Sequence, residues 1–156
     1  MATEDLTRML DEAKVSYELL PHAHTESATD EAKALGVSPE DVAKTLVVTT
    51  PDGNVRAVLP ASERLDLHKL AEICGVPRKQ AELASEADLK RDYPEFALGA
   101  VPPVGGRSDR VIVDRRVAER DSVVFEGGTH EESVRLAAAD LVRVSGGELD
   151  DITRDD

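Results

Sequence analysis

Lys44 is the residue whose type and position first suggest chemistry. It directly precedes a β-branched run at 45–49, and turn residues at 51–54 separate that run from a second apolar run at 55–59. This pattern predicts a β-hairpin with a lysine where its first strand begins. A lysine held beside apolar walls can bind a phosphate or a carbonyl oxygen. For a single lysine, a solvated position at the end of a helix is the commoner alternative.

The stretch 98–106, LGAVPPVGG, is the second candidate for a functional segment. Paired prolines fix the backbone and three glycines permit close approach, so neither a helix nor a central strand can form there. A linker of this composition is one interpretation. Because linkers are usually polar, a stiff apolar loop that forms one wall of a pocket is the other interpretation.

The histidines and the single cysteine give weaker indications. His22 and His24 point the same way on an extended chain and could hold a metal, but no third ligand lies nearby in sequence. A metal-dependent hydrolase would also have to use His68 and His130. Cys74 fits a small core residue better than a nucleophile. With no Ser-His-Asp order and no paired carboxylates, we expect no metal, no cofactor and no covalent nucleophile.

The elements that position these residues follow from caps and periodicity. Ser27 or Thr29 begins a helix that Gly36 ends, and Ser38 caps a short helix that leads to Lys44. Glycines 127–128 interrupt the chain sharply after a strand. The other predicted elements are strands at 15–20, 111–113 and 122–125, helices at 66–74 and 85–93, and a core run at 134–142.

The length of 156 residues suits one domain, and we place it at residues 1–144. Residues 146–156 carry five acids and one arginine without periodicity, so we expect 145–156 to be an acidic, disordered tail. The N-terminus is acidic where a signal peptide is basic, and no apolar run approaches the ~18 residues of a membrane span. These features favour a cytoplasmic protein without a membrane partner.

The formal charge of −13 opposes non-specific binding to phosphate backbones, and we expect no DNA partner. A high-salt habitat or a biased genome would explain this acidity without any function. One dense basic stretch follows the Gly-Pro loop and could form a local phosphate track or remain a set of solvated turn charges. Its members are Arg107, Arg110, Arg115, Arg116 and Arg120.

Several segments taken together resemble the YbaK / prolyl-tRNA synthetase-associated editing domain family. In chain order they are EAKALGV, VAKTLVV, GNVRAVLP, LDLHKLAE, GAVPPVGG, VIVD and EGG, between about His24 and Leu141. The resemblance implies a single α+β domain with a curved, mixed, barrel-like sheet surrounded by helices. It also implies a trans-editing deacylase that hydrolyses the ester of a mischarged aminoacyl-tRNA, often tRNA(Pro) carrying Ala or Cys.

On this resemblance Lys44 corresponds to the family's essential lysine. The loop from Gly99 to Gly105 would line the aminoacyl pocket, and the turn at 127–128 would lie on its other side. The expected substrate-binding residues are Thr45, Gly99, Val101, Pro102, Pro103, Gly105, Gly127, Gly128 and His130. The expected partner is the aminoacylated 3′ end of tRNA, and a prolyl-tRNA synthetase could supply much of the tRNA affinity.

The chain departs from the family pattern at three places. The run 92–98 replaces a Thr-Gly pair found in many relatives, and Glu126 and Ser133 stand where some bacterial members carry Ser and Asp. These departures concern the choice of amino acid more than the fold. A non-catalytic module of the same fold, which binds a small ligand or a synthetase, is the alternative function.

Overall fold

The structure, a computed structural model, describes residues 4–155, and within this range the strands form two sheets. The larger sheet has the strand order β4-β2-β3-β5-β8. Its members are β2 (Ala43–Thr50), β3 (Gly53–Pro60), β4 (Glu82–Leu83), β5 (Arg110–Asp114) and β8 (Glu148–Asp150). Strand β2 pairs antiparallel with β3 and β4, whereas β5 pairs parallel with β3 and β8. The predicted hairpin and the mixed pairing are therefore both confirmed.

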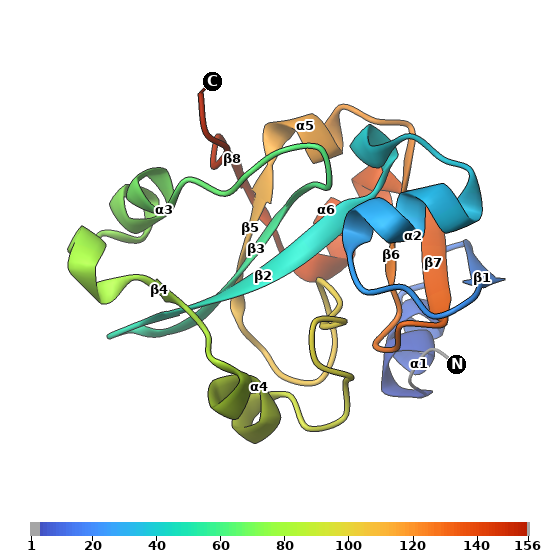
Figure 1. Cartoon of the computed structure of the whole chain (residues 1–156), viewed down its shortest axis with the longest axis horizontal. Helices are drawn as coiled ribbons and strands as arrows, with labels where there is room; N and C mark the ends of the chain where they lie inside the picture. Colours follow the sequence, from blue (N-terminus) through green and yellow to red (C-terminus); the bar gives the residue numbers. More distant parts are fainter. Residues whose placement is uncertain (1–3, 156) are drawn as a thin grey trace.

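The smaller sheet is antiparallel and contains β1 (Tyr17–Pro21), β7 (Glu132–Ala137) and β6 (Ser122–Glu126) in that order. A single parallel bridge between Val42 and Val124 joins it to the start of β2. Figure 1 shows the long β2–β3 hairpin crossing the molecule, with the smaller sheet to one side. The α+β class is confirmed, and the strands form two open sheets, joined at this bridge, in place of one barrel-like sheet.

The helices begin and end at residues whose side chains or backbone suit those positions. They are α1 (Glu4–Glu12), α2 (Ala28–Leu35), α3 (Leu67–Cys74), α4 (Glu86–Asp92), α5 (Arg115–Ala118) and α6 (Ala138–Ser145). Ser27, Asp66 and Ser85 accept hydrogen bonds from the first-turn amides of α2, α3 and α4, as predicted. None of the helices in residues 4–155 has the length and apolar character needed to cross a membrane.

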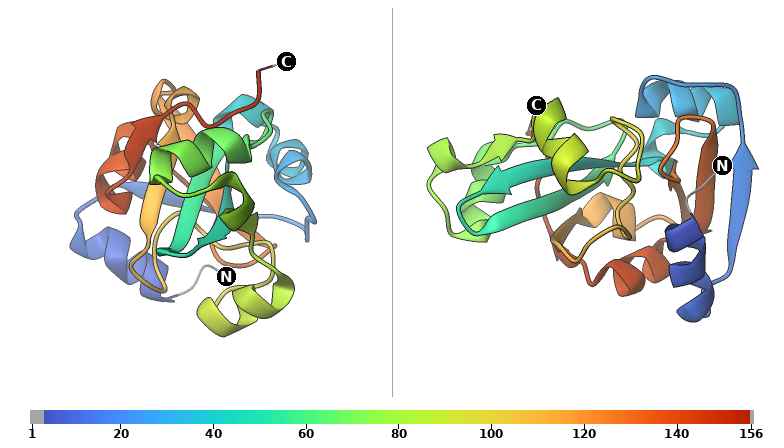
Figure 2. Two further views of the ribbon diagram at one scale, coloured as in Figure 1. Left: turned by 90° about the vertical axis from the view of Figure 1, so that its left-hand side faces the viewer. Right: turned by 90° about the horizontal axis from the view of Figure 1, so that it is seen from below.

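Two main apolar clusters lie toward opposite ends of the molecule. One lies between the smaller sheet and helices α1 and α6, and includes Leu6, Phe125 and Leu141. The other packs α3 on the larger sheet through residues such as Leu70 and Ile112. Figure 2 shows this division: the tip of the hairpin and α3 lie at one end, and α1 with β1 lies at the other.

The expected disorder of residues 145–156 is wrong for the part of the tail that the structure describes. Strand β8 pairs with β5, and Ile152 is completely buried in the cluster under α3. The Ile152 amide donates to the Asp114 carboxylate. The tail acids also have partners: Arg110 pairs with Glu148, and Lys69 pairs with Asp151 and Asp155. One buried apolar side chain and paired charges thus order a segment whose composition predicts disorder.

Candidate active site

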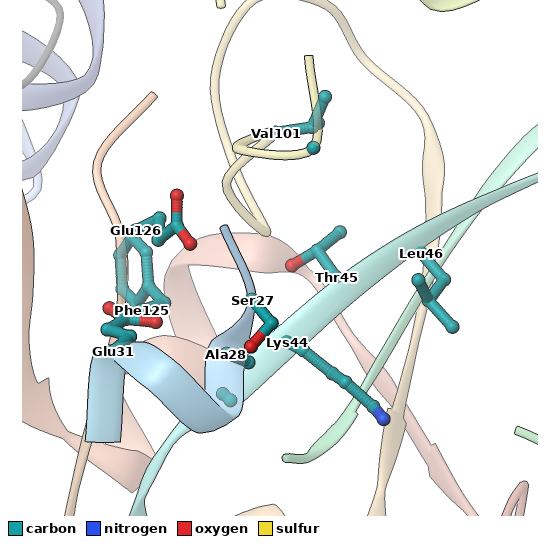
Figure 3. A pocket seen from close by; sticks show the side chains of 11 residues that line it. Ser27, Ala28, Glu31, Lys44, Thr45, Leu46, Val101, Phe125 and Glu126 are labelled. Atoms are coloured by element: carbon teal, nitrogen blue, oxygen red, sulfur yellow. The ribbon is translucent and has the colours of Figure 1, made fainter. Parts of the chain in front are cut away.

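A cavity of about 190 Å³ lies where α2, the start of β2, the Gly-Pro loop and the end of β6 meet. Figure 3 shows its walls: α2 with Ser27 and Glu31 on one side, β2 with Lys44 and Thr45, and Val101 from the loop above. Eleven residues line it: Ser27, Ala28, Glu31, Ala43, Lys44, Thr45, Leu46, Gly99, Val101, Phe125 and Glu126. Four of them, Lys44, Thr45, Gly99 and Val101, are predicted site residues.

Lys44 is positioned by the turn that precedes β2. The Ser38 side chain caps the 3₁₀ turn Pro39–Asp41, and β2 begins two residues later with Lys44 opposite Leu59 of β3. Burial, and secondarily the nearby Arg64 charge, lowers the pKa of the Lys44 ammonium. No carboxylate in residues 4–155 forms an ion pair with it. Lys44 is therefore a half-buried cation available for an anionic or carbonyl oxygen of a ligand.

Thr45 follows Lys44 on the strand and points to the opposite side, as alternation along β2 requires (Figure 3). Its hydroxyl oxygen is buried and has no hydrogen-bond partner among the described residues. A buried polar atom without a partner costs about 1–3 kcal/mol, so such atoms are uncommon and indicate an absent ligand or water. Thr45 thus presents a free hydroxyl to the cavity.

The Gly-Pro loop is a pocket wall rather than a linker. Gly99 and Val101 line the cavity, and Gly99 has a positive φ of 81° beside the His130 ring, a conformation that favours glycine. Pro102, Pro103 and Gly105 do not line it. The carbonyls of Pro102 and Gly105 instead accept hydrogen bonds from the Arg56 guanidinium, which also forms an ion pair with Asp109 at 3.0 Å.

Arg56 is a positioning residue that the sequence analysis missed. It is a charged side chain on β3 with only 1% exposure, and its guanidinium lies 5.0 Å from the centre of the Tyr93 ring. The Tyr93 hydroxyl donates to the same Asp109 carboxylate. The signal in the sequence is one arginine in an otherwise apolar strand, VRAVL, which indicates a buried ion pair but does not identify its partner.

The glycine turn lies behind the cavity rather than in its wall. The amide of Gly127 donates to the Glu132 carbonyl at 3.0 Å, and the carbonyl of Gly128 accepts from the Ala97 amide at 2.8 Å. His130 places its Nε2 2.6 Å from the Leu98 carbonyl oxygen. Because a carbonyl only accepts, Nε2 carries the proton. Gly127, Gly128 and His130 therefore fasten the turn to the Gly-Pro loop.

Two buried carboxyl groups form the acidic end of the cavity. Burial, and secondarily the neighbouring Glu31 charge, raises the pKa of Glu126 to about 8. Burial raises the pKa of Glu31 to about 7, although a hydrogen bond from Ser133 opposes this shift. Sequence analysis noted Glu126 only as a departure from relatives and did not find Glu31, because the two residues lie 95 positions apart and meet only through packing of α2 on β6.

Glu31, Ser133 and the partly buried His22 form a chain of contacts. The Ser133 hydroxyl touches the Glu31 carboxyl and lies 2.9 Å from His22 Nε2. A nucleophilic serine needs a histidine between itself and the acid, whereas here the serine is in the middle. Ser133 is also completely buried and does not line the cavity. This chain therefore supports the position of Glu31 and does not form a nucleophile.

A metal site and a phosphate track of arginines each require particular side chains to gather in the fold. Within residues 4–155, no group of three or more His, Cys, Asp or Glu side chains is placed to hold a metal ion. The five arginines of the dense basic stretch all form ion pairs with acids, namely Arg107 with Asp109, Arg110 with Glu148, Arg115 with Asp150, Arg116 with Asp114 and Arg120 with Asp41. They do not form a track of free cations.

Comparison with known families decides the identity of this arrangement. The family model described as "Aminoacyl-tRNA editing domain" matches residues 22–144, which include the whole cavity. The chain belongs to the aminoacyl-tRNA editing domain family. The resemblance inferred from the sequence motifs is thereby confirmed.

Individual proteins are similar to this chain over nearly its whole length. A protein of Enterococcus faecalis described as a candidate Cys-tRNA(Pro)/Cys-tRNA(Cys) deacylase, EbsC, is 28% identical over 151 residues, covering 94% of this chain and 90% of its own. The crystal structure of the hypothetical protein APE2540 matches with a TM-score of 0.87 and 25% identity, over 97% of this chain and all of that one.

A second solved structure, that of a candidate trans-editing enzyme for prolyl tRNA synthetase, has a TM-score of 0.84 and 24% identity. It covers 99% of this chain and 100% of its own. The two-sheet α+β architecture is therefore shared with these two solved structures. Strand β8 also lies within the matched length, in agreement with an ordered C-terminal segment.

Proposed function

We propose that this chain is a trans-editing aminoacyl-tRNA deacylase that hydrolyses the ester of a mischarged tRNA, with tRNA(Pro) carrying Ala or Cys as the expected substrate. The observation that carries the proposal is the cavity within the editing domain, which an unpaired, half-buried Lys44 lines together with Gly99 and Val101. A cavity of about 190 Å³ suits a small aminoacyl group. Such an enzyme acts where tRNAs are charged, in the cytoplasm.

The reaction proceeds by positioning. Water adds to the ester carbonyl carbon, the bond from that carbon to the ribose oxygen breaks, and the ribose oxygen takes up a proton, which releases the free amino acid. The Lys44 ammonium binds a phosphate or carbonyl oxygen at the rim of the cavity. The amides of Gly99 and Val101, which have no backbone acceptor in residues 4–155, can donate to the oxygen that gains charge.

A deacylation assay tests the proposal. Wild-type protein is incubated with labelled Ala-, Ser- and Cys-tRNA(Pro) and with cognate Pro-tRNA(Pro), at low and high salt. We expect one mischarged species to be hydrolysed while the cognate is spared. Replacement Lys44→Ala should lower kcat/KM for that species by about 10²- to 10³-fold, the usual effect of removing one group that stabilises the developing charge.

Lys33→Ala is the matched control, because Lys33 is an exposed lysine on α2 outside the cavity. It should leave the rate unchanged. If Lys44→Ala hydrolysed the mischarged tRNA at the wild-type rate while remaining folded, the role given to Lys44 would be wrong. If folded wild type hydrolysed none of the species, with or without prolyl-tRNA synthetase, the non-catalytic binding module would be the better interpretation.

A synthetase partner fits the charge of the molecule. The formal charge of −13 repels free tRNA, and the dense arginine stretch is paired with acids. We therefore propose that the 3′ end of tRNA is recognised in the cavity while prolyl-tRNA synthetase holds the rest of the tRNA. Prolyl-tRNA synthetase should lower KM for the mischarged species and leave kcat nearly constant.

A further inference from the structure

Three buried polar atoms near the cavity have no hydrogen-bond partner among the described residues: Thr45 Oγ1, Glu126 Oε2 and His130 Nδ1. Their placement is not scattered. Thr45 and Glu126 line the same cavity, and His130 Nδ1 lies 2.9 Å from Glu126 Oε2 without the alignment of a hydrogen bond. The Glu126 side chain is only 9% exposed. Unpartnered atoms of this kind are expensive, so together they indicate a group that the ligand supplies.

All three atoms can accept hydrogen bonds. The Glu126 carboxylate and the Thr45 hydroxyl oxygen are acceptors, and His130 uses its Nε2 proton on the Leu98 carbonyl, which leaves a lone pair on Nδ1 in the neutral ring. An ammonium group has three N–H donors and no acceptor. An ammonium bound in the cavity could therefore donate to the Thr45 hydroxyl and to the Glu126 carboxylate, the two of these groups that line it. A side-chain hydroxyl or thiol offers a single donor and would leave one of these two groups unpaired.

The charges at the two ends of the cavity give the ligand a direction. Figure 3 shows the Glu126 carboxyl and the Thr45 hydroxyl facing the same space, whereas the Lys44 side chain extends away from them. Glu31 adds a second carboxyl beside Glu126. An aminoacyl ester on tRNA has matching polarity, with an α-amino group at one end and a phosphate near the ribose at the other. An α-amino group directed toward Lys44 would meet a like charge.

We propose that Glu126, with Thr45, binds the α-amino group of the aminoacyl ester and so selects esters that carry a free amine. This inference rests on the proposed deacylase function and adds a substrate requirement to it. Burial holds the empty carboxyl group largely protonated near neutral pH, so it can pass its proton to an unprotonated amine on binding and form a carboxylate–ammonium pair. N-acylated and 2-hydroxyacyl esters would be rejected.

The test compares alanyl-tRNA(Pro) with lactyl-tRNA(Pro), made from it by nitrous acid deamination, in which a hydroxyl of similar size replaces the amino group. Each rate is divided by the spontaneous hydrolysis rate of the same ester. Wild type should favour the alanyl ester by about 10- to 100-fold, the range for a buried charged hydrogen bond. Glu126→Gln should reduce this ratio to near one, mainly by slowing the alanyl ester.

Glu131→Gln is the matched control, because Glu131 is exposed, lies five residues away and does not line the cavity. It should keep the wild-type ratio. A wild-type ratio near one, or an unchanged ratio in folded Glu126→Gln, would overturn the inference while leaving the deacylase intact. Should Glu126→Gln fail to fold, the wild-type ratio still decides. Absence of hydrolysis of alanyl- and cysteinyl-tRNA(Pro) would instead contradict the proposed function itself.

Discussion

Glu31 is a buried acid at the cavity whose protonation is coupled to the fold. Its side chain is 1% exposed, and burial raises its pKa from 4.5 to about 7. The groups that face it are Ser133, His130 and Glu126, and His22 reaches it through Ser133. The folded protein thus binds a proton at Glu31 that the unfolded chain has released, throughout the interval between these two pKa values.

This coupling predicts the sign of a pH effect. Because the folded state holds more protons than the unfolded state between pH 4.5 and about 7, the unfolding free energy should fall as pH rises through that window. Glu31→Gln removes the contribution of Glu31 to this dependence, whereas Glu126, whose pKa is raised to about 8, keeps its own. The difference in unfolding free energy between pH 5 and pH 8 should shrink by roughly 2 kcal/mol relative to wild type. Urea unfolding at several pH values measures it.

The exposed Glu12, at the end of α1, provides the control for the Glu31 variant. Glu12→Gln should reproduce the wild-type pH profile, since its carboxyl is hydrated in both states. A Glu31→Gln profile as steep as that of wild type would show that Glu31 is ionised in the folded protein and would contradict the assignment.

At the scale of elements, Arg56 holds the Gly-Pro loop against β3. It joins the carbonyls of Pro102, Gly105 and Arg107 to one buried cation, which Asp109 neutralises. Arg56→Met should destabilise the protein by about 3 kcal/mol, because it removes one of the two arginines that pair with the buried Asp109, the other being Arg107, and leaves the loop carbonyls without their donor. The exposed Arg8→Met on α1 should change stability by less than ~0.5 kcal/mol. Equal denaturation midpoints for the two variants would disprove the role of Arg56.

Local patterns predicted the elements well, and the reason is visible in Ser27, Asp66 and Ser85. Each cap acts within three residues of its helix, so the sequence window contains the whole interaction. The site residues that the sequence predicted correctly also belong to local patterns. Lys44 and Thr45 lie where a strand begins, and Gly99 and Val101 lie in a loop of distinctive composition.

Contacts between distant segments could not be predicted in this way. Glu31 and Glu126 come from different elements and interact only in the folded chain. Arg56 and Pro102 are likewise 46 positions apart, so no local pattern predicts the hydrogen bond between them. The prediction of a disordered tail was wrong for the same reason. The composition of the tail shows its acids, but the arginine and the lysine that pair with them lie far away in the sequence. Burial of a single isoleucine then orders the segment.

The tail gives a direct test of this explanation. Ile152 is fully buried and Leu149 is 47% exposed, although both are apolar residues of the same acidic segment. Ile152→Ala should lower the unfolding free energy by about 2–4 kcal/mol, as other large-to-small core substitutions do. Leu149→Ala is the matched control and should cost less than about 1 kcal/mol. Similar small losses in both variants, measured by urea unfolding, would mean that the tail contributes little.

At the scale of the whole molecule, the excess of negative charge limits how strongly this chain can bind tRNA. The formal charge is −13, and the arginines that follow the pocket loop are occupied by Asp and Glu partners. Lys44 is a half-buried cation at the cavity without such a partner among the described residues. Binding of free tRNA should therefore involve few phosphate contacts.

This limit predicts a shallow dependence of tRNA affinity on salt. Each phosphate contact contributes a slope of about −0.7 to −0.9 to log K against log salt concentration, so one or two contacts give a slope near −1 to −2. Lys44→Ala should make the slope shallower by about 0.7 to 0.9, the contribution of one phosphate contact, whereas Lys33→Ala should leave the slope unchanged. Filter binding across salt concentrations measures all three. A slope of about −4 or steeper would require that the paired arginines exchange their carboxylates for phosphates, and would make a synthetase partner unnecessary for tRNA binding.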